Sequence, residues 1–354
     1  MIRDCDSNDI FDEIREKSAH AARLSLRALV IHPGAVGDCL LTLPLARFLK
    51  HALGLGGVDL MARMDYVGFY PGRTCIDAVR SIESVEMFRL FAKADQFHVG
   101  DHDPLISTFM DYALIVSFLG TANSDFEANL TYTVHCHRSA DVIILPLRPS
   151  EPSEQHVADY YCEEVTHQCS LLPDWRHPPK KDTLLVKPTA EDQTCGREVL
   201  GQVGVASSSP LLVLHPGSGG REKCWHVGNY LAIAQAMKKQ GWAATFILGP
   251  VEQERLGRAQ IEQLAAHAPV IEDLTLGEVA AVLSCAQAFV GNDSGISHLA
   301  AAMGLRTCTV FGPSCAAMYQ PVGPSVQVFN AELSGFTDQV SAEVQGQVLG
   351  SLLR

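Results

Sequence analysis

Four glycine-rich turns in this sequence hold the side chains that could do chemistry. They lie at residues 34–38, 215–220, 246–252 and 291–298, and each follows or ends a short apolar run. In an open parallel sheet, ligands bind at such strand-to-helix turns, where free backbone N–H groups attract anions. The sequence has no Walker loop and no complete G-x-G-x-x-G fingerprint, so ATPase and NAD-dehydrogenase functions lose most of their support.

The turn at residues 34–38 places one carboxylate, Asp38, near the start of a helix. An aspartate at this position caps the free N–H groups of a helix. The same carboxylate could act as a general base toward a hydroxyl group. The pattern alone leaves both roles open. A little further on, Pro44 is predicted to kink or restart the helix.

The turns at residues 215–220 and 246–252 suit a nucleotide. In the first, Ser218 and Gly219 precede Lys223, and backbone N–H groups beside an ammonium favour a diphosphate. An exposed lysine and a core Trp225 are the ordinary alternative. In the second, Glu252 could accept hydrogen bonds from a ribose diol. The helix dipole also favours a glutamate in a first turn, so this role is open as well.

The segment at residues 291–298 is the most informative. It is predicted to be a strand end, a polar turn, and a helix from about Gly295. The first N–H groups of that helix would point toward an anion, while Asp293 would face hydroxyl groups. Capping by Asp293 or Ser294 explains part of this cluster, but it does not explain His298 one turn inside the helix. A further polar turn follows at residues 311–314.

The elements that carry these turns follow from the hydrophobic pattern. Apolar runs at residues 28–31, 58–61, 113–116, 142–145, 211–214, 244–248, 288–290 and 307–311 alternate with amphipathic stretches. This alternation predicts parallel sheets covered by helices on both faces, the doubly wound α/β architecture. The predicted parts are an acidic helical extension (1–26), an N-terminal Rossmann-like domain (27–175), a linker (176–190) and a C-terminal domain (191–354) whose last helix could pack back on the N-terminal domain.

Composition narrows the class of protein. A chain of 354 residues fits two domains, and a formal charge of −13 without a basic run argues against a nucleic-acid partner. The sequence lacks a membrane-spanning stretch and a signal peptide pattern, and its eleven cysteines are scattered, so a cytoplasmic protein is predicted. Six histidines and cysteines could in principle hold a metal, but their spacing matches no standard zinc site: His135, Cys136, His137, Cys162, His167 and Cys169.

Taken together, the motifs resemble glycosyltransferase family 9, which includes the bacterial lipopolysaccharide heptosyltransferases. The matching pieces are residues 34–38 with Leu43 and Pro44, 215–218 with Lys223 and Trp225, 249–252, 291–301 and 311–313. The resemblance implies two Rossmann-like domains that face each other across a cleft, the GT-B type. It also implies sugar transfer with inversion and without a metal or cofactor, from a nucleotide-sugar donor, usually ADP-heptose, to a lipopolysaccharide-core or other cell-envelope glycan.

The resemblance implies roles for the matching residues. Asp38 matches the family's proposed catalytic base, and Gly37 and Arg63 lie on the acceptor side with it. The implied donor contacts are Ser218, Gly219 and Lys223 to the diphosphate, Glu252 to the ribose, and Asp293, Ser294, Gly295 and His298 to the donor sugar and phosphates.

The sequence departs from the family at His32-Pro33, where the first loop commonly has a basic residue. A strongly acidic chain is also an awkward partner for an anionic acceptor, so Arg63, Arg73 and Arg80 are candidates for a local basic patch. A glycolipid acceptor would allow a peripheral contact with the inner membrane face. The alternatives are a nucleotide-sugar epimerase of the same fold and a non-catalytic descendant that binds a glycan, a nucleotide or a protein.

Overall fold

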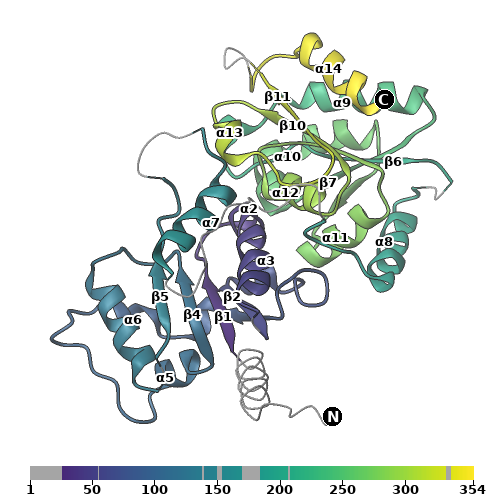
Figure 1. The fold of residues 1–354 in the computed structure, drawn as a ribbon. Helices are drawn as coiled ribbons and strands as arrows, with labels where there is room; N and C mark the ends of the chain where they lie inside the picture. The colour runs from purple at the N-terminus through teal and green to yellow at the C-terminus, as the bar shows by residue number, and fades with distance from the viewer. Residues whose placement is uncertain are drawn as a thin grey trace, which may run out of the picture.

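Two sheets of parallel strands form the framework of the molecule (Figure 1). The computed structural model describes residues 26–54, 56–137, 139–149, 154–169, 184–205, 208–331 and 336–354. Within them, the first sheet has the order β3-β2-β1-β4-β5 and the second the order β11-β10-β9-β6-β7-β8, so the predicted α/β fold with two Rossmann-like units is confirmed. The strands are β1 (Arg27–Ile31), β2 (Gly57–Ala62), β3 (Ala78–Ser81), β4 (Tyr112–Ser117), β5 (Asp141–Ile144), β6 (Leu211–His215), β7 (Ala243–Leu248), β8 (Val270–Glu272), β9 (Ala288–Asn292), β10 (Arg306–Phe311) and β11 (Val326–Asn330).

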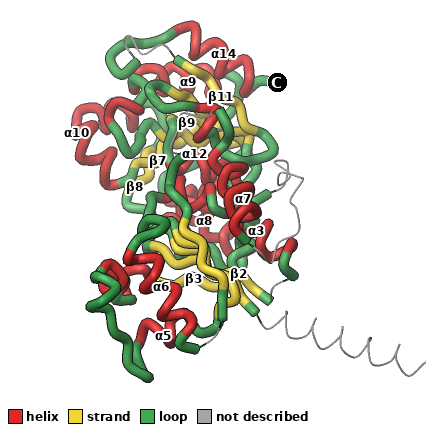
Figure 2. The backbone as a smooth tube through the Cα atoms, turned by 60° about the vertical axis from the view of Figure 1, so that its left-hand side comes forward, coloured by secondary structure: helices red, strands yellow, loops and turns green. Residues whose placement is uncertain are grey.

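Helices cover both faces of each sheet, and the two sets of strands lie in separate lobes (Figure 2). The helices are α2 (Val36–Leu41), α3 (Leu43–Ala52), α4 (Met64–Val67), α5 (Pro104–Phe109), α6 (Asp125–His135), α7 (Val157–Gln168), α8 (Ala190–Gln202), α9 (Val227–Lys239), α10 (Pro250–Ala265), α11 (Leu276–Ser284), α12 (Gly295–Ala302), α13 (Ala316–Tyr319) and α14 (Ala342–Leu352). Pro44 lies in the first turn of α3, directly after α2 ends, so the predicted restart of the helix is confirmed.

The central strand β1 shows why the first sheet is covered on both sides. Its last four residues are fully buried, and they alternate between two hydrophobic cores. Ala28 and Val30 pack with residues of α3 and α7, whereas Leu29 and Ile31 pack with residues of α5 and α6. A strand that is apolar on both faces can only be stable between two helical layers. The uninterrupted apolar run in the sequence therefore predicts this layer order correctly.

The two domains touch where the carboxyl ends of their sheets face each other. Helix α2 follows β1 and helix α12 follows β9, and the two helices pack against one another. Glycines allow this approach, because a Cβ at Gly37 would lie 3.1 Å from His298 Cδ2 and a Cβ at Gly295 would lie 2.7 Å from Val36 Cβ. The packing brings the first turn of α2 directly against the amino end of α12.

Further contacts join the domains around this point. The Arg73 guanidinium binds the Asp192 carboxylate with two hydrogen bonds of 2.8 and 2.7 Å. On another side, His156 Nε2 donates to the Gln320 carbonyl at 2.8 Å. One hydrophobic core also runs through both domains, since Val30 and Leu299 belong to the same cluster. The relative placement of the domains thus depends on apolar packing as well as on polar contacts.

The last helix corrects one expectation. Instead of packing back on the N-terminal domain, α14 lies on the C-terminal sheet against α9, β10 and β11. Its apolar face is buried with that domain's core, and Arg306 donates to the Leu352 carbonyl at the helix end. The predicted extension, apart from Leu26, and the predicted linker up to residue 183 lie outside the described residues.

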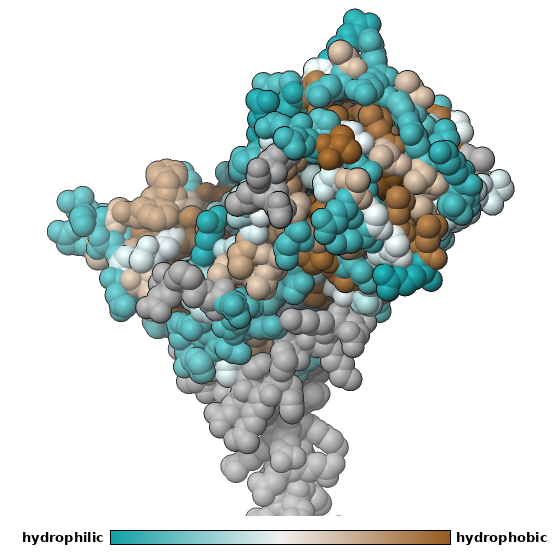
Figure 3. All heavy atoms as spheres, turned by 90° about the horizontal axis from the view of Figure 1, so that it is seen from above, coloured by the Kyte–Doolittle hydropathy of each residue, from teal (hydrophilic) through white to brown (hydrophobic). Residues whose placement is uncertain are grey.

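The surface that is seen from above is mixed in character (Figure 3). Hydrophilic residues surround the rim of the C-terminal lobe, and hydrophobic residues lie between them. Within the described part of the chain, no helix has both the length and the apolar composition needed to cross a bilayer.

Candidate active site

The turn after β1 presents Asp38 at the domain interface. Asp38 lies in the first turn of α2, and its Oδ2 accepts a hydrogen bond of 2.9 Å from the Ala35 N–H. The expected capping contact is therefore present. It uses one carboxylate oxygen, and the side chain is only half-buried, so a second role toward a hydroxyl group is compatible with it. That role stays a prediction.

His32 lies beneath this turn and is fully buried. Its Nδ1 accepts a hydrogen bond of 3.1 Å from the Gly34 N–H, and its Nε2 has no hydrogen-bond partner among the described residues. Burial lowers the pKa of His32 to about 4, although the negative charge of Asp38 acts in the opposite direction. The ring is neutral near pH 7, so it does not supply the positive charge that the family's basic residue would bring.

On the C-terminal side, Asn292 at the end of β9 holds two turns together. Its Oδ1 accepts hydrogen bonds from the Trp225 N–H at 3.0 Å and from the Tyr230 hydroxyl at 2.7 Å. Its Nδ2 donates to the carbonyls of Pro216 and Gly217 at 2.8 and 3.1 Å. The buried amide is thus fully satisfied. It fixes the turn at residues 215–220 against the end of β9.

Next to Asn292, the Asp293 carboxylate lies between two groups that can carry positive charge. Lys223 Nζ is 2.7 Å from its Oδ2, and His298 Nε2 is 3.9 Å from its Oδ1. Burial opposes ionisation, but the hydrogen bond from Lys223 and the nearby His298 ring outweigh it and hold the pKa of Asp293 well below its usual range. Asp293 is therefore an anion that positions Lys223 and His298.

The amino end of α12 completes this cluster. Ser294 is the N-cap, and its hydroxyl accepts a hydrogen bond from the Ser297 N–H. The first N–H groups of a helix, here those of Gly295 and Ile296, have no acceptor within the helix. Together with the ammonium of Lys223 and the ring of His298, these groups can bind a phosphate. The predicted residues of this turn are thus brought together.

Glu252 reaches the same turns from α10. Its Oε2 accepts from the Gly249 N–H at 2.9 Å and lies 3.7 Å from His215 Nε2. Burial raises the pKa of Glu252, but the contacts with His215 and the Gly249 N–H outweigh it, so the pKa lies below the usual value. Glu252 Oε1 packs under Gly217, because a Cβ at that glycine would lie 2.0 Å from it. The carboxylate is ionised and buried at the base of the turn.

The arginines predicted to form a basic patch have different environments. The predicted role of Arg73 in a basic patch for the acceptor is wrong, because Asp192 binds its guanidinium across the domain interface. Arg80 lies 3.9 Å from the buried carboxylate of Asp59 and stacks on a tyrosine ring. Arg63 follows β2 at the carboxyl end of the sheet, and its side chain is 47% exposed. Of the three, Arg63 has the most exposed side chain, and its guanidinium lies 3.7 Å from the Glu83 carboxylate and over the Tyr66 ring.

His135 and Cys136, from the histidine and cysteine cluster, lie at a helix end. His135 is the last residue of α6 and Cys136 is its C-cap, so His135 and His137 do not share the face of a strand. Cys162 and Cys169 are buried at α7, which leaves packing as their role. Within the described residues, no group of three or more histidines, cysteines, aspartates and glutamates is placed to hold a metal ion.

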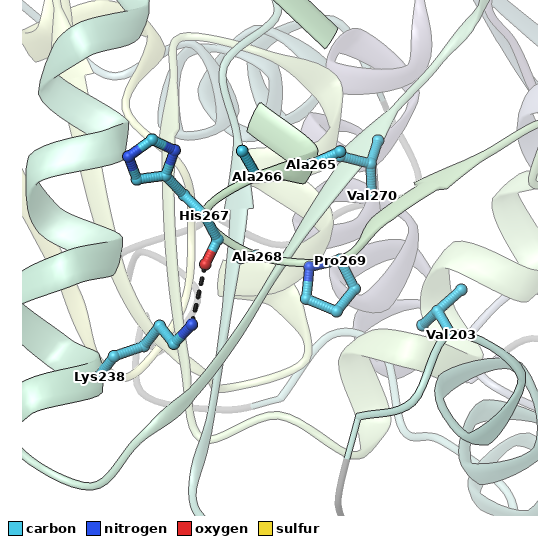
Figure 4. Close-up of a pocket in the computed structure, with 8 residues that line it drawn as sticks. All are labelled: Val203, Lys238, Ala265, Ala266, His267, Ala268, Pro269 and Val270. Carbon is cyan, nitrogen blue, oxygen red and sulfur yellow. Dashed lines mark hydrogen bonds between the residues drawn. The ribbon is translucent and has the colours of Figure 1, made fainter. Parts of the chain in front are cut away.

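Figure 4 shows a pocket in the C-terminal domain that is separate from the candidate site. It lies beside the loop that enters β8, at the edge of the sheet opposite the glycine-rich turns. Its lining is mostly aliphatic, and its one ammonium, that of Lys238, donates to the His267 carbonyl at 3.0 Å. Its other polar side chain, His267, has Nδ1 2.9 Å from the Gln263 carbonyl, and the lining contains no carboxylate.

Three features of the site were not predicted. They are the role of Asn292 as a buried connector, the contacts of Arg255 with the carbonyls of Ser218 and Gly219, and the approach of Arg148 to within 6.0 Å of the Tyr319 ring from the other domain. An asparagine that ends an apolar strand was a usable signal in the sequence. The two arginines give no such signal, since long-range contacts of exposed side chains leave no local pattern.

Comparison with known proteins places the chain in the family that its motifs resemble. A family model described as glycosyltransferase family 9 (heptosyltransferase) matches residues 151–348, which is more than half of the chain. The chain is 36% identical to lipopolysaccharide heptosyltransferase 1 of Pseudomonas aeruginosa, over a match that spans only 30% of either protein. It is 23% identical to lipopolysaccharide heptosyltransferase 3 of Escherichia coli, over 80% of this chain and 83% of that protein.

A solved structure extends the likeness to the whole fold. The structure titled E. coli ADP-heptose lps heptosyltransferase II superposes with a TM-score of 0.63 at 17% sequence identity, covering 93% of this chain and 99% of that one. At this identity the superposition shows a shared fold. The predicted GT-B type architecture is thereby confirmed.

Proposed function

Because the chain belongs to glycosyltransferase family 9, we propose that it transfers heptose from ADP-heptose to an acceptor sugar of the lipopolysaccharide core, with inversion at the anomeric carbon. The relatives it matches are named for lipopolysaccharide heptosyltransfer, and the E. coli structure is titled for ADP-heptose. The observation that carries the proposal is the packing of α2 against α12, because it places a carboxylate beside an anion-binding helix end.

In the proposed reaction, Asp38 accepts the proton of the acceptor hydroxyl. The hydroxyl oxygen then forms a bond to the anomeric carbon, and the bond from that carbon to the diphosphate oxygen breaks. The nucleoside diphosphate leaves with the electron pair, on the face opposite to attack. The arrangement requires a base on one side and donors of hydrogen bonds on the other, and the two domains each supply one of these.

The donor side would stabilise the leaving diphosphate through the protein's own groups. Lys223, His298 and the first N–H groups of α12 converge on one place, with Ser218 and Gly219 in the adjoining turn. Asp293 and Glu252 are ionised acceptors for the hydroxyls of the donor sugar and ribose, as proposed for the matching residues. These groups supply the charge that a divalent metal supplies elsewhere, so the proposal requires no metal or cofactor.

The acceptor side of the proposal is carried by the N-terminal domain. Gly37 and Arg63 follow the carboxyl ends of β1 and β2, which open toward the domain interface. Arg148 lies beyond β5 and approaches Tyr319, so a second cation faces the same edge. Cations are the expected partners of a phosphorylated or carboxylated core sugar. With a glycolipid acceptor, the reaction would take place in the cytoplasm at the inner membrane face, through a peripheral contact.

The test is to replace Asp38 and follow transfer and ADP binding separately. In Asp38→Asn, transfer to a lipopolysaccharide-core acceptor should fall by about 10²–10⁴-fold, the usual contribution of general base catalysis. ADP affinity should stay near the wild-type value, because Asp38 lies on the other domain. Asn can still accept the Ala35 N–H, so the cap is retained.

Two controls define the outcome. Wild-type transfer should persist in excess chelator, and a loss of activity that magnesium restores would contradict the metal-independent part. Turnover of Asp38→Asn within a few-fold of wild type would remove Asp38 from the mechanism. Product stereochemistry, read by NMR of the new glycosidic bond, tests inversion directly.

A further inference from the structure

Arg255 on α10 contacts one side of the glycine-rich turn that contains Ser218 and Gly219. Its Nη1 donates to the Ser218 carbonyl at 2.8 Å, and its Nη2 donates to the Gly219 carbonyl at 2.7 Å. A guanidinium is a planar fork of fixed donors, so it can hold two neighbouring carbonyls at the same time. Both carbonyls therefore point toward α10.

The direction of these carbonyls determines the direction of the N–H groups. In a planar trans peptide, the C=O and N–H bonds point to opposite sides, and every described peptide bond here is trans. The Ser218 carbonyl shares its peptide with the Gly219 N–H, and the Gly219 carbonyl shares its peptide with the Gly220 N–H. Two successive N–H groups thus point away from α10. Successive N–H groups on one side of a turn form a concave anion site.

The rest of the turn is held so that this side stays open. Ser218 Oγ donates to the Asp293 carbonyl at 2.6 Å, and the Lys223 N–H donates to the Gly220 carbonyl at 3.1 Å. Glu252, one helical turn before Arg255, packs under Gly217. In contrast, nothing lies within 4 Å of a Cβ placed at Gly219, whereas a Cβ at Gly220 would lie 2.1 Å from Glu222 Oε1, the end of a flexible side chain. Helix α10 supports the turn from one side and leaves space at Gly219 on the other.

We propose that Arg255 is a positioning residue that aims the Gly219 and Gly220 N–H groups at the diphosphate of the donor. The inference rests on the proposed function, since the donor provides the anion. Arg255 acts through the two carbonyls rather than on the ligand, and its fork geometry matters more than its charge. Arg255 would therefore belong to the donor site without touching the donor.

The test uses three variants of the full chain and three ligands. Arg255→Met removes both donors at similar length, and Arg255→Lys keeps the charge but loses the fork. Arg258→Met is the matched control, because Arg258 lies in α10 just beyond the kink at Gly257, with a side chain 92% exposed and paired to Glu262. Dissociation constants for ADP, pyrophosphate and adenosine are measured by calorimetry.

We expect Arg255→Met to weaken ADP and pyrophosphate by at least about tenfold, the equivalent of one hydrogen bond of about 1.4 kcal/mol, and to leave adenosine unchanged. Arg255→Lys should resemble Arg255→Met, and Arg258→Met should resemble the wild type. Equal losses for ADP and adenosine would indicate a general structural role and overturn the proposal. Wild-type ADP affinity in Arg255→Lys would show that charge alone acts, which also overturns it.

A measurement without ligand separates this inference from the proposed function. Amide hydrogen exchange of residues 216–222 should be faster in Arg255→Met than in Arg258→Met, because the turn loses its two anchors. If the wild-type protein binds neither ADP nor pyrophosphate, the proposed function fails, and the exchange rates alone then decide whether Arg255 orders the turn. Unchanged exchange in Arg255→Met would overturn that part as well.

Discussion

Replacing Gly295 by alanine should separate the base from the donor site without unfolding either domain. The added Cβ would lie 2.7 Å from Val36 Cβ and 3.0 Å from its Cγ1, across the interface between α12 and α2. Ordinary carbon contacts are about 3.5–4.0 Å, so the two helix ends must move apart by roughly 1 Å. A misplacement of about 1 Å can cost roughly 10²-fold in rate.

Transfer by Gly295→Ala should therefore show a kcat about 100-fold below wild type. ADP affinity should change only a few-fold, because the C-terminal domain carries the donor turns and the Gly295 N–H is retained. The free energy of unfolding should fall by about 1–3 kcal/mol, the usual cost of one overpacked contact, because the collision is confined to the contact with α2. Transfer assays, calorimetry with ADP and urea unfolding measure these quantities.

A reciprocal change tests the mechanism. Val36→Gly in the Gly295→Ala background removes both colliding carbons and leaves the Gly37 N at 3.2 Å as the closest atom, so kcat should recover in large part. Gly346→Ala in α14 is the control, because nothing lies within 4 Å of a Cβ there. Near wild-type kcat in Gly295→Ala, or a failure of Val36→Gly to restore it, would refute the reasoning.

Three further predictions concern stability. Asn292→Ala should lower the free energy of unfolding by about 3–5 kcal/mol, because the buried groups that bond to its side-chain amide lose their partner. Urea titration measures this loss, and a loss under 1 kcal/mol would contradict the role of Asn292 as a connector. The pKa of His32 is about 4 in the folded protein and near 6.5 in the unfolded chain. As the pH falls from 6.5 to 4, the free energy of unfolding of the wild type should therefore decrease by about 3 kcal/mol more than that of His32→Asn. Parallel plots of this free energy against pH for the two proteins would refute the prediction. The pKa of Asp192 is lowered, since the bonds from Arg73 and Thr189 outweigh burial, so its stabilisation exists above about pH 4 and disappears as the pH falls further. Asp192→Asn should cost about 3 kcal/mol at pH 7 and converge with wild type in acid, as thermal unfolding can check.

The interior strands were predictable from sequence because burial on both faces leaves a continuous apolar run. β1, β4, β6 and β9 all have this pattern. Three of the edge strands, β3, β8 and β11, do not, since each has one neighbour and few buried side chains. The position of α14 was missed for a related reason. Its apolar stripe identifies a buried face, but the surface that covers it is set by the whole domain.

The candidate site divides in the same way. Its turns were visible because glycines and small polar residues cluster locally, and the capping contacts of Asp38 and Ser294 follow from position in a helix. The ion pair of Lys223 with Asp293 joins residues far apart in the chain. Such a pairing is decided by how β6 and β9 lie side by side. The sequence therefore predicts which residues lie on these turns better than which contacts hold the turns in place.

The pairing of Lys223 with Asp293 also bears on how a chain of net charge −13 would bind the proposed diphosphate. Without a ligand, Asp293 neutralises Lys223 and keeps its ammonium at the turn, so little order must be gained on binding. An ammonium has three donors, and it can keep Asp293 while it binds a phosphate oxygen. The disadvantage of the pairing is that the Asp293 carboxylate stays near the bound phosphate and repels it. The first N–H groups of α12 and His298 then have to supply the attraction that Lys223 shares, which explains why the helix end, the histidine and the lysine occur in one place.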